Sequence, residues 1–211
     1  MPEIRLAQSD DLPAVGEVFA AGFAHSIEHA GSSHAGARAM ADIFGLALAA
    51  EPGSLMVAER GGQVVGYALG SCDIRRLQWR AFWRGGWVRV LLRAVTGAYG
   101  IRWQTVRTVL GDKLSFLRGA RIGTEHRARM LSLAVHPDHQ GQGTGRRLFA
   151  AGLRRLETIG CAGIRLEVRP DNAPARHLYE CFGFRPCGQY SDSQGQWLIM
   201  LKEVRQAPDP R

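Results

Sequence analysis

Residues 128–160 pass from an apolar run through a glycine-rich turn into a second apolar pattern with a different period. The run ARMLSLAVHP reads as a strand, with Leu131, Leu133 and Val135 expected on one face. Glycines then occupy every second position of GQGTG, and from Gly143 onward the apolar residues recur at helical spacing. A strand that feeds a helix through so short a turn indicates an α/β fold, in which the helix covers one face of a sheet.

Short strands and helices alternate in the same way along the rest of the chain. The expected order is β, α, α, β, β, insertion, β, α, β, α, β, β, with a helix near residues 34–50. The second and third strands are joined as a hairpin by Gly61 and Gly62. We therefore predict one domain over residues 2–204, with helices on the faces of a mixed sheet. The last residues, 205–211, are predicted to be disordered.

The composition is typical of a folded, soluble protein. Hydrophobic residues make up 45% and charged residues 22%, without the acidic or Ser/Pro excess of disordered chains. No leader pattern and no uncharged apolar stretch of membrane-spanning length is found. The four cysteines form no CxxC pair, so neither a zinc site nor a disulfide framework is indicated. We expect a cytoplasmic protein without a metal.

The glycine-rich turn is suited to binding an anion. The first N–H groups of a helix are unpaired and lie at the positive end of its dipole. Glycine has no Cβ, so a bulky anion such as a pyrophosphate can approach these amides closely. Arg146 and Arg147 add positive charge in the first helical turn. The turn lacks the GKS or GKT of a Walker A loop and the spacing GxGxxG. A flexible surface loop is the alternative.

The turn places Gln140, Gly143 and Gly145 in the pattern Q/R-x-x-G-x-G/A. This pattern resembles the one with which the GNAT superfamily of N-acetyltransferases binds the pyrophosphate of acetyl-coenzyme A (acetyl-CoA). The chain also resembles the family in the stretch LEVRPDNAPARHLYECFGF. In the bacterial ribosomal-protein alanine N-acetyltransferases, a strand ending in LEVR is followed by N-x-x-A-x-x-x-Y-x-x-x-GF. The residues that fall into this register are Asn172, Ala175, Tyr179, Gly183 and Phe184.

The resemblance covers roughly residues 2–204, with residues 74–129 as an interruption. It implies a GNAT-type mixed, mostly antiparallel sheet with helices on both faces. Residues 74–129 would then form a basic, Trp/Arg-rich helical insertion between the third and fourth strands. It also implies acetyl-CoA as the donor co-substrate and no metal.

Two catalytic residues are implied by the resemblance. Glu167 would accept the proton of the acceptor amine, directly or through water. Tyr179 would protonate the departing thiolate, a role that suits a phenol because its pKa of ~10 lies close to that of an alkyl thiol. The structural alternatives are a surface charge for Glu167 and a core aromatic for Tyr179.

The implied cofactor-binding residues lie on the strand, in the turn and near Tyr179. The strand backbone would pair with the pantetheine arm like an added strand, and one of its N–H groups would polarise the acetyl carbonyl. Asn172 would contact the cofactor or serve as the N-cap of its helix. His136 and His139 are expected to be solvated turn residues, and the roles of Cys72 and Asp73 stay open. The full set is Leu133, Ala134, Val135, Gln140, Gly141, Gln142, Gly143, Thr144, Gly145, Arg146, Asn172 and Tyr179.

The basic segment 74–129 carries a net charge of +11, while the rest of the chain carries −3. Within it, Trp79, Trp83 and Trp87 recur every four residues, as on one face of a helix, and a second helix is expected near residues 101–117.

Three interpretations of this segment stay open. The tryptophans pack onto their own domain or onto a second copy in a homodimer. Alternatively, residues 75–118 lie on an anionic membrane surface, at the inner face of the membrane. In the third, the arginines bind an acidic acceptor or RNA, against which the lack of an ordered nucleic-acid-binding motif argues.

These observations predict an acetyl-CoA-dependent N-acetyltransferase in which a primary amine attacks the thioester directly. We expect the amine to belong to a small molecule or an amino sugar, with a protein N-terminus or lysine as the alternative. A non-catalytic acyl-CoA sensor, or a module that binds a membrane or partner, is the alternative from another class. The presence of both Glu167 and Tyr179 argues against it.

Overall fold

The computed structural model describes residues 1–23, 33–83, 88, 90, 92–93, 126–192 and 195–204. The strands are β1 (Glu3–Leu6), β2 (Leu55–Arg60), β3 (Gln63–Ser71), β4 (Ala128–Val135), β5 (Gly163–Val168), β6 (Arg185–Asp192) and β7 (Gly195–Glu203). The helices are α1 (Leu12–Gly22), α3 (Ser33–Ala50), α4 (Ile74–Trp83), α7 (Thr144–Thr158) and α8 (Ala173–Cys181). Two short 3-10 turns lie at Ser9–Asp11 and Pro137–His139.

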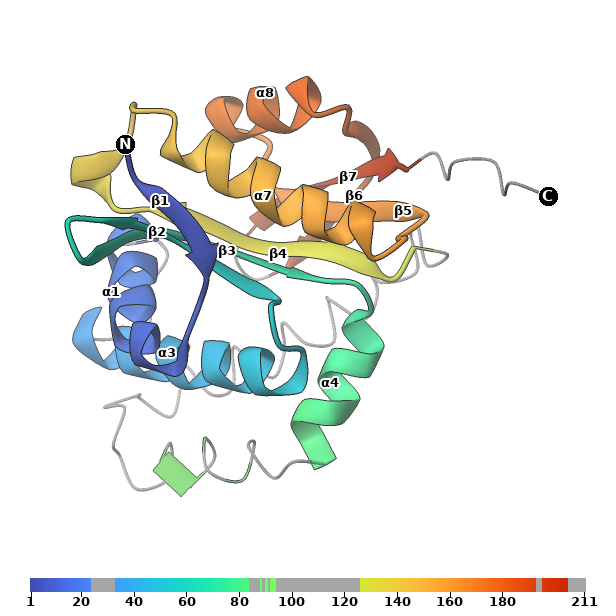
Figure 1. The fold of residues 1–211 in the computed structure, drawn as a ribbon. Helices are drawn as coiled ribbons and strands as arrows, with labels where there is room; N and C mark the ends of the chain where they lie inside the picture. The colour runs from blue at the N-terminus through green and yellow to red at the C-terminus, as the bar shows by residue number, and fades with distance from the viewer. Residues whose placement is uncertain are drawn as a thin grey trace.

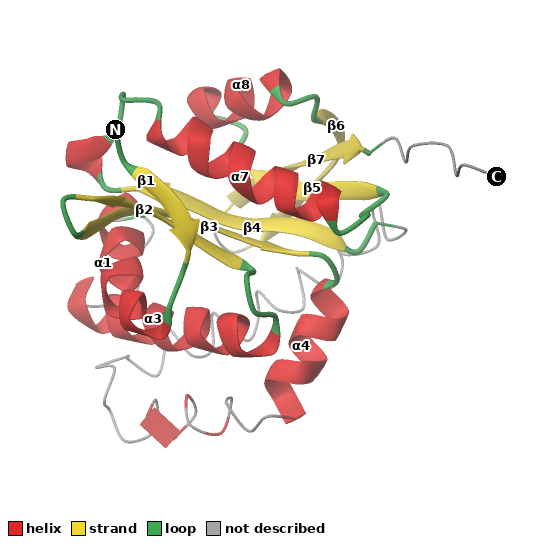
Figure 2. Ribbon diagram, in the orientation of Figure 1, coloured by secondary structure: helices red, strands yellow, loops and turns green. Residues whose placement is uncertain are grey.

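The strands form one mixed sheet in the order β1-β2-β3-β4-β5-β7-β6. The β4–β5 pair is parallel, and the other neighbouring pairs are antiparallel. Helices α7 and α8 cover one face of the sheet, while α1, α3 and α4 lie on the other (Figure 1; Figure 2). The predicted element order and fold class are therefore confirmed, including the hairpin between β2 and β3.

A separate hydrophobic cluster fills each side of the sheet. Under α7 and α8, Leu148 and Phe149 pack with Ile164 and Met200 of the sheet. On the other side, the buried residues of α1, α3 and α4 pack against β2 and β3, with Tyr67 among them. Because both faces are covered, β3 is buried along most of its length, which explains the continuous apolar run in its sequence.

Strand β4 corrects one expectation from the sequence. The prediction that Leu131 shares a face with Leu133 and Val135 is wrong, because Leu131 packs in the cluster of α1, α3 and α4 while the other two pack under α7 and α8. The cause is a β-bulge: Ser132 pairs with β3 and so does Met130, which leaves Leu131 as the extra residue. An extra residue shifts the alternation of the side chains by one position.

Helix α4 corrects a second expectation. Its buried residues are Leu77 and Ala81, whereas the side chains of Trp79 and Trp83 are exposed. The interpretation that the tryptophans pack onto their own domain is therefore wrong for these two. Trp87 and the helix expected near residues 101–117 lie outside the described residues, as does the tail 205–211. Among the helices that are described, none is long and apolar enough to cross a membrane.

The crossing of α1 and α3 depends on a glycine. A Cβ on Gly16 would overlap the backbone carbonyl oxygen of Ala37, whereas one on Gly45 would lie 3.2 Å from Cδ1 of the Leu12 side chain. We expect Gly16→Ala to lower the free energy of unfolding by about 2 kcal/mol or more, because the backbone cannot move aside cheaply. Gly45→Ala is the control and should change it by less than about 1 kcal/mol, since alanine favours the helix. Urea unfolding of both variants tests this, and equal losses would contradict it.

Candidate active site

The candidate active site begins where β4 and β5 separate. Within the described residues these parallel strands pair only at Ala128↔Ile164 and Arg129↔Arg165. On its other side, β4 stays paired with β3 as far as Val135. Beyond Arg129, the edge of β4 that faces β5 therefore has no partner strand among the described elements. Its backbone N–H and C=O groups remain available to an extended ligand.

The glycine turn lies at the far end of this edge, between β4 and α7. Gly141 and Gly143 have φ values of +74° and +76°, a region that glycine adopts without strain. A Cβ on either residue would meet no atom within 4 Å, so open space lies outside the turn. Gly145 does not have a positive φ, and a Cβ there would only touch Val135. The turn conformation therefore requires glycine at two of the three positions.

Gly143 is the N-cap of α7 and, having no side chain, makes no side-chain capping hydrogen bond to the first turn of the helix. The helix is 15 residues long, so its unpaired N–H groups lie at the positive end of a well-formed dipole. Thr144, the first residue of the helix, is buried. Exposed glycines beside uncapped N–H groups form an arrangement that accepts a phosphate group.

The two glutamines of the turn contact protein groups. Gln140 donates from Nε2 to the backbone oxygen of Val135 at 2.9 Å, which closes the turn onto the end of β4. Gln142 accepts a hydrogen bond from Arg60 at 2.8 Å. Both side chains thus brace the turn, a role that the sequence pattern alone did not reveal.

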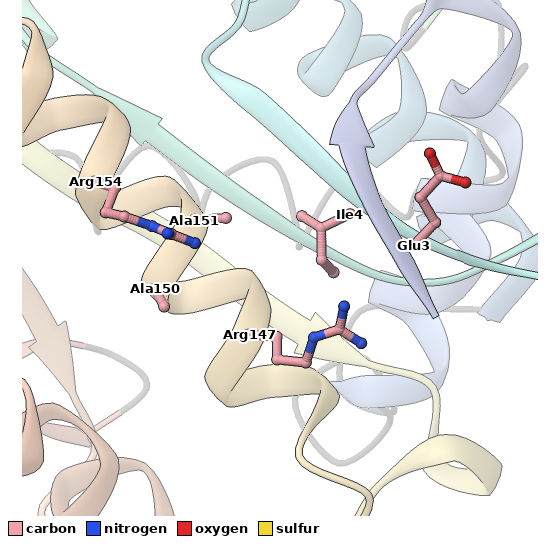
Figure 3. Close-up of a pocket in the computed structure, with 6 residues that line it drawn as sticks. All are labelled: Glu3, Ile4, Arg147, Ala150, Ala151 and Arg154. Atoms are coloured by element: carbon pink, nitrogen blue, oxygen red, sulfur yellow. The ribbon is translucent and has the colours of Figure 1, made fainter. Parts of the chain in front are cut away.

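The two arginines in the first turn of α7 lie on different sides of the helix. The guanidinium of Arg146 lies over the ring of Phe182, 5.3 Å from its centroid, and so faces α8. Arg147 instead lines a hollow between α7 and β1, where Figure 3 shows it reaching toward Ile4. No residue predicted for the site lines this hollow, which is formed by Glu3, Ile4, Arg147, Ala150, Ala151 and Arg154.

Tyr179 packs on the α7 side of the sheet. Its ring lies 4.9 Å from that of Phe149, and both belong to the cluster that contains Leu166 of β5. Tyr179 is only partly buried against this cluster, and among the described residues none donates a hydrogen bond to its hydroxyl. Burial raises the pKa of Tyr179 to about 12. The phenol therefore keeps its proton well above neutral pH and is able to donate it.

Glu167 lies on the opposite face of β5, because its neighbours along the strand point into the cluster under α7 and α8. Its Oε1 accepts from Arg165 at 2.8 Å and from Arg129 at 3.4 Å, and only 16% of its side chain is exposed. Arg129 and Arg165 are buried. Burial raises the pKa of nearby Tyr190, and the Glu167 carboxylate adds to that rise. Glu167 thus belongs to a half-buried ion-pair cluster, which rules out a mere surface charge.

Neither arginine of this cluster is among the residues predicted from the sequence for the site. Arg165 stands two residues before Glu167, so alternation on a strand places the two on one face. Arg129 is the β4 residue that pairs with Arg165 in the last β4–β5 pair. The first contact could have been inferred from RLEVR in the sequence, but the second depends on which strands are neighbours.

The remaining candidates have local structural contacts. Asn172 accepts from the backbone N–H of Ala175 at 3.1 Å and is the N-cap of α8, as the structural alternative predicted. His136 accepts from the N–H of Asp138 and caps a short turn. Asp73 accepts hydrogen bonds from two backbone N–H groups in the first turn of α4. Cys72 donates hydrogen bonds from its backbone N–H and its Sγ to Oε1 of Glu51. Within the described ranges, no three His, Cys, Asp or Glu side chains gather to hold a metal.

Comparison with known proteins places this geometry in a family. Residues 24–184 match the profile of the Acetyltransferase (GNAT) family. The chain is 47% identical over 57 residues to the [ribosomal protein bS18]-alanine N-acetyltransferase of Escherichia coli (strain K12). That stretch covers 27% of this chain and 38% of the relative. It is also 41% identical over 66 residues to the mycothiol acetyltransferase of Brachybacterium faecium, covering 31% of this chain and 20% of that one.

Solved structures share the fold along nearly the whole chain. The crystal structure of SsHAT superimposes with a TM-score of 0.70 at 24% identity and covers 97% of this chain and 99% of its own. The structure of yncA from Salmonella typhimurium, which holds its cofactor acetyl-CoA, gives a TM-score of 0.57 at 20% identity. It covers 100% of this chain and 98% of its own. The stretches shared with the curated relatives are much shorter, at 20–59% of each relative's length.

Proposed function

The chain belongs to the Acetyltransferase (GNAT) family, and on that premise we propose that it transfers an acetyl group from acetyl-CoA to a primary amine. The observation that carries the proposal is the uncapped glycine turn at the start of α7, which lies at the end of the β4 edge that β5 leaves open. One end of the site fits a pyrophosphate and the rest fits an extended chain. Acetyl-CoA has these two parts in this order.

In this proposal, residues 2–204 form one functional unit and two of their segments bind the donor. The N–H groups around Gly143 hold the pyrophosphate, and the backbone of Leu133, Ala134 and Val135 pairs with the pantetheine arm. The carbonyl oxygen of Val135 already accepts a hydrogen bond from Gln140, so only its second lone pair is left to accept one from the pantetheine arm. Thr144 and Arg146, in the first turn of α7, contribute to binding the pyrophosphate. Asn172 contributes by fixing the start of the helix that carries Tyr179.

Tyr179 and Glu167 lie on opposite faces of the sheet, on either side of the opening between β4 and β5. A thioester in that opening would have a proton donor on one side and a proton acceptor on the other. The acceptor nitrogen forms a bond to the acetyl carbon, and the carbon–sulfur bond breaks. Tyr179 gives its proton to the sulfur, while Glu167 takes one from the amine, directly or through water.

The contacts of Glu167 suit this role. Both arginine ion pairs are to Oε1. Anchoring Oε1 fixes the orientation of the carboxylate, and in this proposal Oε2 receives the proton of the amine. Arg129 and Arg165 are therefore positioning residues in this proposal.

We expect Glu167→Gln to lower kcat by about 100-fold, because the amide cannot accept a proton, while the Kd for acetyl-CoA stays unchanged. Glu180→Gln on α8 is the control, since Glu180 is an exposed residue whose pair with Arg176 is long, at 3.9 Å. The measurements are steady-state kinetics and calorimetric titration with acetyl-CoA. A wild-type kcat and an unchanged pH profile in Glu167→Gln would rule out the base role.

The acceptor is proposed to be an amine on a small molecule or an amino sugar. The E. coli relative is named for an alanine of a ribosomal protein, and the Brachybacterium relative for mycothiol, so the family reaches both kinds of acceptor. Residues 72–127 separate β3 from β4 by far more than a hairpin and carry the chain's whole excess of basic residues. A protein N-terminus or lysine is the alternative acceptor.

Thiol release from acetyl-CoA across a panel of acceptors tests the proposal. The panel contains amino sugars, polyamines, free amino acids and peptides that differ in their N-terminal residue. Release that depends on an amino sugar or a polyamine would support the small-molecule acceptor. Release with peptides alone would overturn that choice and leave the acetyl transfer in place.

A further inference from the structure

Helix α4 presents three large aromatic side chains to solvent. Trp79, Phe82 and Trp83 are 64%, 63% and 67% exposed, and we refer to them as the α4 aromatic surface. The rings of Trp79 and Trp83 lie 5.4 Å apart, and Phe82 meets Trp83 edge to face at 6.0 Å. They thus form one continuous patch. Exposed apolar patches of this kind mark sites of interaction, since a soluble surface rarely keeps its largest apolar residues together.

The opposite side of α4 fixes the helix to the domain. Leu77 and Ala81 are buried in the cluster that α1 and α3 form with the sheet. Arg80 donates to the backbone oxygen of Ala50 at the end of α3. The aromatic surface therefore does not result from a detached helix, because α4 is packed by one face and presents the other.

The charge of α4 restricts what could cover this surface. Its sequence IRRLQWRAFW contains three arginines and no acidic residue, and Arg75 and Arg76 are exposed. Aromatic rings together with arginines on a helix face suit the boundary between lipid headgroups and acyl chains. Anionic headgroups attract the arginines, while the rings enter the apolar layer. An anionic bilayer thus satisfies both parts of the surface.

The position of α4 relates this surface to the candidate active site. The N–H of Ile74 donates to the backbone oxygen of Arg127 at 3.2 Å, and Arg127 pairs with Asp73. Helix α4 therefore starts beside the beginning of β4. Its contact there, Arg127, stands two residues before Arg129, which belongs to the Glu167 cluster. The glycine turn lies at the other end of β4. A surface that α4 contacts would be at the Glu167 end of the site, away from the pyrophosphate.

We propose that the α4 aromatic surface docks the chain on an anionic lipid bilayer. The docking rests on α4 alone. A second point rests on the proposed function: the docked bilayer lies at the end of the site where the acceptor enters.

Vesicle flotation tests the docking with the full chain. The vesicles contain phosphatidylcholine alone, or phosphatidylcholine with about one third phosphatidylglycerol. We expect binding to the mixed vesicles and little to the neutral ones. Replacing Trp79, Phe82 and Trp83 together with alanine should weaken binding about tenfold or more. Arg75→Gln with Arg76→Gln should weaken it about 30-fold, because each arginine near an anionic surface accounts for roughly a fivefold gain.

The matched control replaces two exposed apolar residues elsewhere, Leu6→Ala and Ile159→Ala, and should bind as the wild type does. Each variant is also titrated with acetyl-CoA, since an unchanged Kd shows that the fold is intact. The arginine variant keeps all apolar contacts of α4, so it remains informative even if the aromatic variant fails to fold.

Several results would overturn the docking. They are no binding to mixed vesicles, equal binding to neutral vesicles, or binding that neither set of substitutions weakens. A dimer in solution that the aromatic substitutions dissociate would assign the surface to a second copy of the chain. Binding of single-stranded RNA that vesicles do not compete would assign it to nucleic acid. Thiol release with a soluble amine but no vesicle binding would refute the docking alone. Vesicle binding without thiol release from any amine would refute the proposed function alone.

Discussion

Replacing Tyr179 with Phe is expected to lower kcat by about 10²- to 10⁴-fold, the usual contribution of general acid catalysis. The phenylalanine keeps the ring contact with Phe149, so the Kd for acetyl-CoA and the free energy of unfolding should change little. Tyr67→Phe is the control, since it also removes a buried hydroxyl but from the other side of the sheet. Steady-state kinetics with a found acceptor measure the effect. A variant that keeps the kcat of the wild type would show that the thiolate takes its proton elsewhere.

The same residue gives an expectation for the pH dependence. Burial raises the pKa of Tyr179 to about 12, so the phenol stays protonated through neutral and moderately alkaline pH. We expect kcat to show no alkaline decline from this residue below about pH 11. The folded state binds this proton more tightly than the unfolded state, where the pKa is near ~10. Its contribution to stability is thus complete below about pH 10 and is lost as the pH rises through about 12. A decline of kcat near pH 9 that disappears in Tyr179→Phe would contradict this.

The second large effect is expected for Gly143→Asp, which should raise the Kd for acetyl-CoA by at least about 100-fold. A carboxylate there would lie where the proposal puts the pyrophosphate, and like charges a few ångströms apart repel by several kcal/mol even at a partly screened site. The space around Gly143 is open, so the new side chain meets no protein atom within 4 Å at its Cβ.

Gly160→Asp separates this repulsion from backbone strain. Gly160 also has a positive φ, +90°, and open space around it, but it lies past the opposite end of α7. Both variants should lose about 1–2 kcal/mol of stability, because a side chain is strained in this region. Only Gly143→Asp should lose affinity, as measured by calorimetry. Equal affinities in the two variants would mean that the pyrophosphate does not bind at the turn.

Much of the fold could be predicted from the sequence because its signals are local. The strand before Gly141, the glycine turn and the helix after it are all set by residues close together in the chain. The bulge at Leu131 could not be predicted, because it depends on how β4 meets β3. The orientation of α4 was missed for a related reason. Its helical spacing allows either side to face the sheet, and the smaller side chains of Leu77 and Ala81 are the ones that pack there.

The candidate site divides in the same way. Glu167, Tyr179 and the glycine turn stand in recognisable patterns, so the sequence locates them. The opening between β4 and β5 is a matter of strand pairing, which ends after Arg129 and Arg165. No pattern along one strand shows where its neighbour departs. Of the two arginines that hold Oε1 of Glu167, Arg165 could have been inferred from the alternation along β5, whereas Arg129 appears only when β4 and β5 lie side by side.

The measurement that tests the central claim most directly is the stoichiometry of transfer. Wild-type protein, acetyl-CoA and the best amine of the panel are incubated, and the free thiol and the acetylated amine are both quantified. We expect one acetylated amine for each thiol released, and about 1% or less of either product in Tyr179→Phe over the same time. Thiol without acetylated amine would indicate hydrolysis, and tight acetyl-CoA binding with no product from any amine would indicate an acyl-CoA sensor. Either result would contradict the account.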